Sequence, residues 1–164
     1  MDERVSAFTT KSDSIRDRLI NIIDIVYGQK SMKATALWDT GANVCCISKS
    51  VAEALEMVST GRKRIQTPSG TSIYKTYLVD LILPNHVEIK DVEVCESEIG
   101  DQGLGLLVGM NIITMGDFSV TNHNGKTVFS FRVPSMQRVD YTKQLSVANV
   151  MRPSHGTGKK KRKR

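Results

Sequence analysis

The chain has 164 residues, 40% of them hydrophobic, which suits one packed domain with tails. Its formal net charge of +6 is carried by the six consecutive basic residues 159–164, so the rest of the chain is formally neutral. This distribution argues against nucleic-acid binding by the body of the chain and leaves that role only to the tail. The longest apolar stretch, residues 19–27, contains Asn21 and Asp24 and is too short to span a membrane.

The cysteines and the N-terminal segment indicate the cellular setting. Residues 1–14 are polar and mixed in charge, without the apolar core of a signal peptide, and we expect them to form a flexible arm. The three cysteines, Cys45, Cys46 and Cys95, are odd in number and have no Cys-x-x-Cys spacing. This usage predicts reduced thiols in a cytoplasmic protein that binds no metal.

Short apolar and β-branched runs alternate with turn residues along the chain, a pattern that predicts many short strands. A capping-box sequence begins at Ser50 and predicts a helix to about Met57, and residues 111–115 are expected to form one helical turn. The expected strands are residues 19–27, 32–38, 44–47, the two arms of a long hairpin over 65–83, then 87–95, 106–108 and the arms of a hairpin over 118–133.

The turn signals separate these strands. Residues 61–64 are expected to form a basic turn, residues 67–71 the tip of the long hairpin, and Asn124-Gly125 a type I′ turn. The pattern predicts an all-β, barrel-like domain over residues 15–135. Residues 136–164 are expected to form a C-terminal extension with a basic, disordered tail.

A short polar motif, Asp39-Thr40-Gly41-Ala42, follows the strand expected over residues 32–38. It offers a carboxylate at a strand end, a hydroxyl that can hold the loop, and a glycine that permits close backbone approach. A bare Asp-Thr-Gly also fits an ordinary β-turn, because turns favour Asp and Gly. The apolar strand before it and a later apolar element, Leu106-Leu107-Val108-Gly109, favour a functional loop.

Together the two motifs resemble those of the retropepsins, the retroviral-type aspartic proteases, and the resemblance extends over about residues 19–134. It implies an acid-protease fold: a closed β-barrel with one or two short helices. The chain has a single Asp-Thr-Gly. The resemblance therefore implies a homodimer in which each subunit supplies half of the active site, with Asp39 as the catalytic residue and no cofactor.

The resemblance also assigns roles around Asp39. Thr40 would hydrogen-bond across the dimer axis, Gly41 would let the substrate backbone come close, and Ala42 and Asn43 would line the substrate cleft. Many retropepsins carry Asp where this chain has Asn43, so the side-chain preference need not be shared.

Two further elements are implied by the same family. Leu107, Val108 and Gly109 would pack beside the catalytic loop, and Gly109 would start a helix. The hairpin over residues 65–83 corresponds to the flap, with Ser69 and Gly70 as tip residues that contact the substrate. An extended peptide would bind between flap and floor.

In such a dimer the two Asp39 carboxylates would share one proton, because like charges this close cannot both ionise cheaply. The ionised partner would act as general base on a water, and the protonated partner would polarise the peptide carbonyl. The predicted function is therefore that of an aspartic endopeptidase.

Two alternatives stay open. One is a catalytically silent module that keeps the fold and binds extended peptides. The other is a nucleic-acid-associated protein that acts through its basic tail. Residues 153–160 resemble a bacterial C-terminal zinc-binding motif without its cysteines, which indicates a bacterial source and no zinc.

Overall fold

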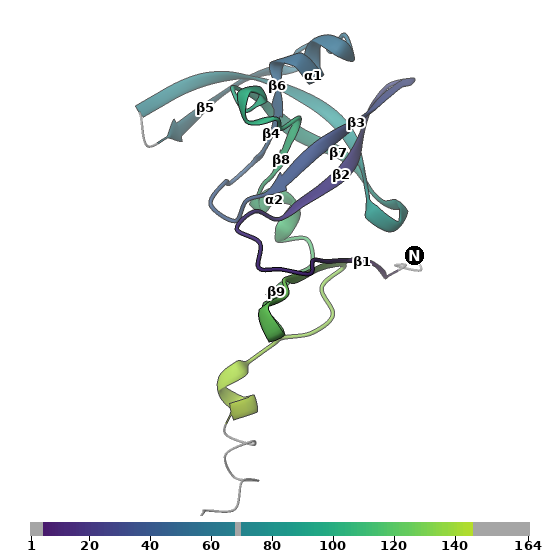
Figure 1. Cartoon of the computed structure of the whole chain (residues 1–164). Helices are drawn as coiled ribbons and strands as arrows, with labels where there is room; N and C mark the ends of the chain where they lie inside the picture. The colour runs from purple at the N-terminus through teal and green to yellow at the C-terminus, as the bar shows by residue number, and fades with distance from the viewer. Residues whose placement is uncertain (1–4, 68–69, 146–164) are drawn as a thin grey trace, which may run out of the picture.

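The computed structural model describes residues 5–67 and 70–145, and it is built mostly of strands (Figure 1). Two short α-helices and three 3-10 turns connect them. Within the described residues no helix is long and apolar enough to cross a membrane. The helical elements are α1 (Lys49–Ala54), α2 (Met110–Ile113), η1 (Pro84–His86), η2 (Gly100–Gln102) and η3 (His123–Gly125), and residues 141–145 are also helical.

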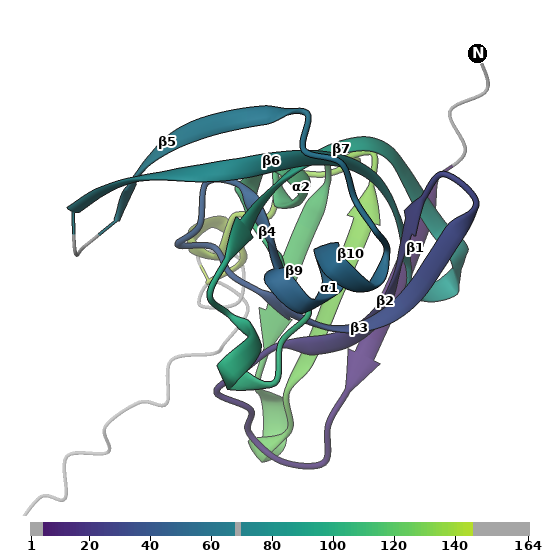
Figure 2. The same cartoon turned by 90° about the horizontal axis from the view of Figure 1, so that it is seen from above.

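Six strands close into a barrel, which confirms the predicted all-β architecture. Their order is β2-β3-β8-β4-β7-β6, and pairing of β2 with β6 closes the ring. β5 pairs only with β6, and this hairpin projects beyond the barrel (Figure 2). The bounds are β2 (Ile20–Tyr27), β3 (Lys30–Trp38), β4 (Cys45–Ser48), β5 (Gly61–Thr67), β6 (Gly70–Leu83), β7 (Val87–Ser97) and β8 (Leu106–Val108).

The barrel core follows from strand alternation. Every second residue faces inward, as Ile23 and Ile25 do on β2, where both are fully buried. The fully apolar β8 buries both Leu106 and Val108. β6 and β7 pair with a register shift between Val79 and Leu81, a bulge that lets two long strands bend around the barrel.

A second, three-stranded sheet joins the two ends of the domain. Its order is β1-β10-β9, from β1 (Ser6–Lys11), β10 (Val128–Val133) and β9 (Asp117–Thr121). The expectation of a flexible arm over residues 1–14 is therefore wrong for β1, which pairs antiparallel with β10 along its whole length. Residues 1–4 lie outside the described part of the chain.

An aromatic cluster holds this sheet against the end of the barrel. It contains the single Trp and all four Phe residues of the chain. Trp38 and Phe118 stack with ring centroids 5.7 Å apart and an interplanar angle of 15°, and Phe8 lies 5.7 Å from Trp38. Phe129 and Phe131 complete the cluster. Such aromatic pairs add stability beyond their buried area, so β1 is an integral part of the core.

Two local expectations are also corrected. Residues 61–64 are not a turn but the first half of β5, because the charged side chains belong to a projecting hairpin that water reaches. The first helix begins at Lys49 rather than Ser50, because the Ser48 hydroxyl accepts the hydrogen bond from the Val51 N–H.

The expected Asn124-Gly125 turn is present. Both residues have positive φ, 52° and 74°, as a type I′ turn requires, and the Lys126 N–H donates to the His123 carbonyl at 3.2 Å. The flanking strands end at Thr121 and begin again at Val128, so the connection is longer than the turn itself.

The chain that follows β10 is fastened to the three-stranded sheet. The Asp117 carboxylate accepts hydrogen bonds from the Met136 N–H, the Ser135 hydroxyl and the Arg132 guanidinium. These bonds, led by that of Met136, hold the pKa of Asp117 well below its usual range. The predicted disorder of the basic tail falls on residues outside the described part of the chain.

Candidate active site

Asp39 is placed by the parallel pairing of β3 with β8. Trp38, the last residue of β3, is the register partner of Val108, the last residue of β8. Directly after the strand, the Asp39 N–H donates to the Val108 carbonyl at 2.9 Å. The half-buried carboxylate therefore emerges where two buried strands end side by side, a rigid position for a functional group.

The Asp-Thr-Gly loop holds its own carboxylate. The Gly41 N–H donates to Asp39 Oδ1 at 2.8 Å, and the Ala42 N–H donates to the Asp39 carbonyl at 3.3 Å. A β-carbon on Gly41 would lie 3.1 Å from Asp39 Oδ1. A side chain at position 41 would therefore crowd the Asp39 carboxylate, and this favours glycine there.

The segment that follows β8, at the start of α2, is hydrogen-bonded to the Asp39 loop. The Met110 N–H donates to the Ala42 carbonyl at 2.7 Å, and the Asn111 N–H donates to the Asn43 carbonyl at 3.2 Å. Gly109 is the N-cap of α2, as predicted, and its N–H donates to Cys45 Sγ at 3.3 Å. The structure therefore brings together the two motifs that lie about seventy residues apart in the sequence.

The remaining loop residues face outward. Thr40 and Asn43 are exposed, and Ala42 is half-buried. The described residues give the Thr40 hydroxyl no hydrogen-bond partner within the chain. No group of three or more His, Cys, Asp or Glu side chains with metal-binding geometry occurs in the same described residues.

The β5–β6 hairpin lies on the same side of the barrel as the loop between β3 and β4 (Figures 1 and 2). Thr67 and Gly70 are its last register pair. Gly70 has φ +124°, a conformation that favours glycine. Ser69, the other predicted tip residue, lies outside the described residues.

The base of the hairpin is tied to the barrel wall. Lys63 on β5 reaches across β6 to form an ion pair with Glu93 on β7, and this contact raises the pKa of Lys63. At the start of β5, the Thr60 hydroxyl donates to the Thr76 carbonyl at 3.1 Å. The Ser59 hydroxyl donates to the same carbonyl at 3.2 Å. These contacts fix the base of the hairpin and leave its free end to project.

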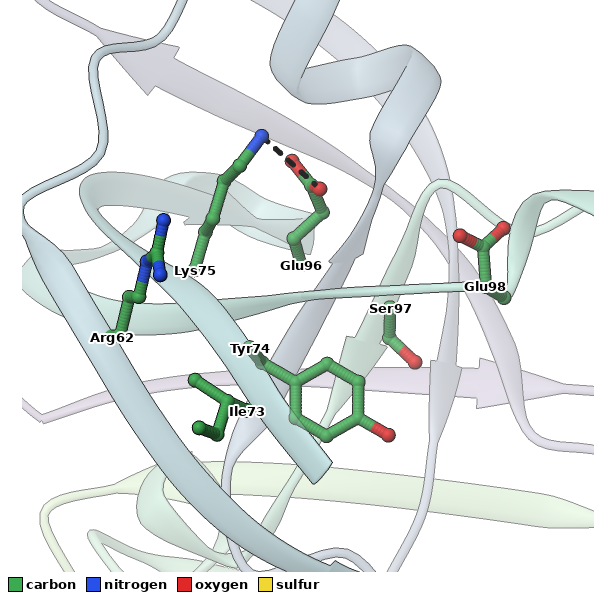
Figure 3. Close-up of a pocket in the computed structure, with 7 residues that line it drawn as sticks. All are labelled: Arg62, Ile73, Tyr74, Lys75, Glu96, Ser97 and Glu98. Atoms are coloured by element: carbon green, nitrogen blue, oxygen red, sulfur yellow. Dashed lines mark ion pairs between the residues drawn. The ribbon is translucent and has the colours of Figure 1, made fainter. Parts of the chain in front are cut away.

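A pocket of about 410 Å³ opens where the hairpin diverges from β7 (Figure 3). Its charged walls include an ion pair between Lys75 and Glu96, whose atoms are 3.7 Å apart. Glu96 also accepts a hydrogen bond from the Tyr77 hydroxyl, and burial together with this bond raises the pKa of Tyr77 to about 12. None of residues 39–43 lines this pocket. The Asp39 carboxylate is therefore outside this pocket.

Sequence reasoning missed the two adjacent cysteines as parts of this region. Burial raises the pKa of Cys45 to about 12, so its thiol is neutral when it accepts the Gly109 N–H. Burial also raises the pKa of Cys46 to about 11, with smaller effects of Cys95 and of Asp39. Strand alternation predicts that Cys45 and Cys46 point to opposite faces, and only Cys45 is buried in the core.

The comparisons with known proteins agree with this geometry. Residues 27–115 match the family described as "gag-polyprotein putative aspartyl protease", more than half of the chain. The chain therefore belongs to this retropepsin-like aspartyl protease family. No curated protein matches the chain.

Among solved structures, a retropepsin-like aspartic protease from Rickettsia conorii is similar, with a TM-score of 0.51 and 16% identity over 81% of this chain and 98% of that chain. This likeness shows the retropepsin-like fold. EIAV protease, solved with the inhibitor HBY-793, has a TM-score of 0.49 and 17% identity, over 60% of this chain and 88% of that one. The retroviral protease-like domain of Ddi1 from Leishmania major has a TM-score of 0.39 and 15% identity, over 67% of this chain and 93% of that one.

Proposed function

We propose that this chain is an aspartic endopeptidase that works as a homodimer and hydrolyses peptide bonds with water activated between two Asp39 carboxylates. The observation that carries the proposal is the placement of Asp39. One carboxylate stands on a braced loop at the end of two buried strands, in a chain that belongs to an aspartyl protease family. The loop supplies one carboxylate, and the chemistry needs two.

The second carboxylate is supplied by a second copy of the chain. The exposed Thr40 hydroxyl, which has no partner among the described residues, is available for a hydrogen bond to that copy. Two Asp39 carboxylates brought together retain one shared proton, because their mutual repulsion raises the pKa of one of them. The charged carboxylate removes a proton from water, and the neutral carboxyl donates a hydrogen bond to the carbonyl under attack.

The substrate is an extended peptide that lies between the β5–β6 hairpin and the Asp39 loop. Ala42 and Asn43 border this space on the loop side, and Gly70 borders it on the hairpin side. Backbone groups of an extended peptide can pair with a projecting hairpin as an added strand.

The test is cleavage of an unbiased peptide library between acidic and neutral pH, at concentrations where sedimentation shows a dimer. We expect the wild type to cleave and Asp39→Asn to lose activity while it keeps its fold. Asp101→Asn, which changes an exposed aspartate on the η2 turn, is the matched control and should cleave as the wild type does. Absence of cleavage by the dimeric wild type, with retained peptide binding, would favour the silent peptide-binding module instead.

A further inference from the structure

Two of the three thiols face each other on the outer side of the barrel wall. Cys46 on β4 and Cys95 on β7 are register partners in a parallel pair. Side chains alternate along a strand, so Cys46 points away from Cys45, which is buried in the barrel core. Register partners share one face, and neighbouring strands lie about 4.8 Å apart. That spacing falls inside the range of about 4.4–6.8 Å that a disulfide can span between α-carbons.

The two sulfurs differ in access. Cys95 is fully buried although it lies outside the main apolar core. The base of the hairpin lies next to it in the sheet: Thr76 on β6 is its register partner, and the Lys63–Glu93 ion pair is close enough to affect the pKa of Cys95. Cys46 is only half-buried. A small oxidant therefore reaches Cys46 first.

The location of the pair connects it to the candidate active site. Cys46 lies on β4, the strand that leaves the Asp39 loop, and the Asp39 carboxylate is near enough to contribute to its raised pKa. Cys95 lies beside Thr76, at the base of the hairpin. One thiol is thus on the strand that follows the Asp39 loop, and the other is on the strand that pairs with the base of the hairpin.

We propose that Cys46 and Cys95 are an oxidation site, at which a peroxide converts the two thiols into a disulfide between β4 and β7. The Cys46 thiolate attacks one peroxide oxygen, the O–O bond breaks, and a sulfenic acid and one water form. The Cys95 sulfur then attacks the Cys46 sulfur, and the departing hydroxide leaves as water with the Cys95 proton. In total, two thiols lose two hydrogen atoms and one hydrogen peroxide becomes two waters.

The reaction is slow at neutral pH and accelerates as the pH rises. The thiolate is the reacting species, and burial keeps the pKa of Cys46 at about 11. Below this pKa, each pH unit raises the thiolate fraction about tenfold. A slow reaction at neutral pH fits a response to sustained oxidation rather than to brief pulses.

The effect on catalysis rests on the proposed function. The S–S bond, about 2.05 Å long, pulls the two side chains together on the strand that follows the Asp39 loop. A displacement of about 1 Å at a reacting group can cost on the order of 100-fold in rate. We therefore expect oxidation to lower peptide cleavage and dithiothreitol to restore it.

The primary test does not depend on proteolysis. The folded protein is treated with hydrogen peroxide, its remaining thiols are alkylated under denaturing conditions, and intact mass and peptide maps are recorded without reduction. We expect the oxidised chain to carry one alkyl group where the reduced chain carries three, to be about 2 Da lighter apart from those groups, and to contain one intramolecular link that joins Cys46 to Cys95. The link should vanish in Cys46→Ser and in Cys95→Ser.

Cys45→Ala is the matched control, because Cys45 is the chain neighbour of Cys46 but faces the core. This variant should still form the link. A map in which Cys46 carries only sulfinic acid, or joins Cys45 or a second chain, would overturn the proposal. If the link forms in a protein that cleaves no peptide, the proposed protease function fails while the oxidation site stands.

Discussion

Gly109 lies against the backbone of Val44 with no space for a side chain. A β-carbon on Gly109 would lie 2.5 Å from the Val44 carbonyl oxygen and 2.9 Å from that of Ala42. The contact joins the start of α2 to the end of the Asp39 loop, so the two motifs are held together by backbone atoms rather than by side chains.

We expect Gly109→Ala to destabilise the domain by about 1–3 kcal/mol, the usual cost of overpacking a filled site. The Asp39 loop must move to relieve the contact. The cleavage rate should therefore fall by more than the loss of folding stability alone explains. Urea unfolding and peptide-cleavage rates measure the two effects. Gly100→Ala is the control, because its β-carbon would meet only ordinary contacts at 3.6 Å. Equal stability of the two variants would contradict the tight contact.

Mixing experiments test whether each subunit contributes one Asp39. If an equal amount of Asp39→Asn chain is added to a fixed amount of wild type and subunits exchange freely, half of the wild-type chains pair with the variant. The cleavage rate should then fall to about half, because a mixed dimer has a single carboxylate. An unchanged rate after exchange, verified by mass spectrometry of the dimers, would mean that one chain suffices.

Phe8 is expected to be a stability determinant although it lies near the N-terminus. Its ring is 3% exposed and packs within the aromatic cluster, with Phe129 at 5.7 Å between centroids. Phe8→Ala should cost about 3–5 kcal/mol, as large-to-small core substitutions do. Lys11→Ala, at an exposed position of the same strand, should change stability by no more than about 0.5 kcal/mol. Thermal unfolding of both variants provides the comparison, and a mild effect at Phe8 would show that β1 is dispensable.

Cys45 should make the fold sensitive to alkaline pH. Burial raises the pKa of its thiol to about 12 in the folded chain, from an ordinary value of 9.0. Between these values the unfolded chain has lost the proton and the folded chain has kept it, so stability falls as pH rises. By about pH 10 the loss from this one group is about 1 kcal/mol. Between about pH 8 and about pH 10, the free energy of unfolding measured in urea should therefore fall by about 1 kcal/mol less for Cys45→Ala than for the wild type. If the unfolding free energies of the two proteins fell in parallel with pH, the loss of stability could not be assigned to Cys45.

The sequence was sufficient to predict the parts of the fold in which local pattern and packing agree. The apolar run before Asp39 predicted β3, and the uninterrupted Leu106–Val108 run predicted a buried strand. Their parallel pairing places Asp39, and it joins segments that no local pattern connects. At the level of the sequence, only the resemblance to the retropepsins connects these segments.

The sequence failed where a strand has little apolar character. β1 buries one residue, Phe8, among polar neighbours, and its partner β10 lies more than a hundred residues away in the chain. The charged first half of β5 belongs to a hairpin with water on both faces, so alternation is absent there. The capping-box pattern at Ser50 does not mark the helix start, because the Ser50 hydroxyl contacts that of Ser48 at 2.9 Å and the Ser48 hydroxyl caps the helix instead.

Because β1 pairs with β10 of the same chain, a protomer can fold before it associates with a second copy. Every described strand finds its hydrogen-bonded neighbours within one chain, so a newly made protomer can complete its barrel before it meets a second copy. Assembly of the two half-sites is then a second-order step whose extent depends on protomer concentration. Under the proposed mechanism, the amount of chain in the cell sets the fraction of working sites, and dilution is the simplest way to switch the activity off.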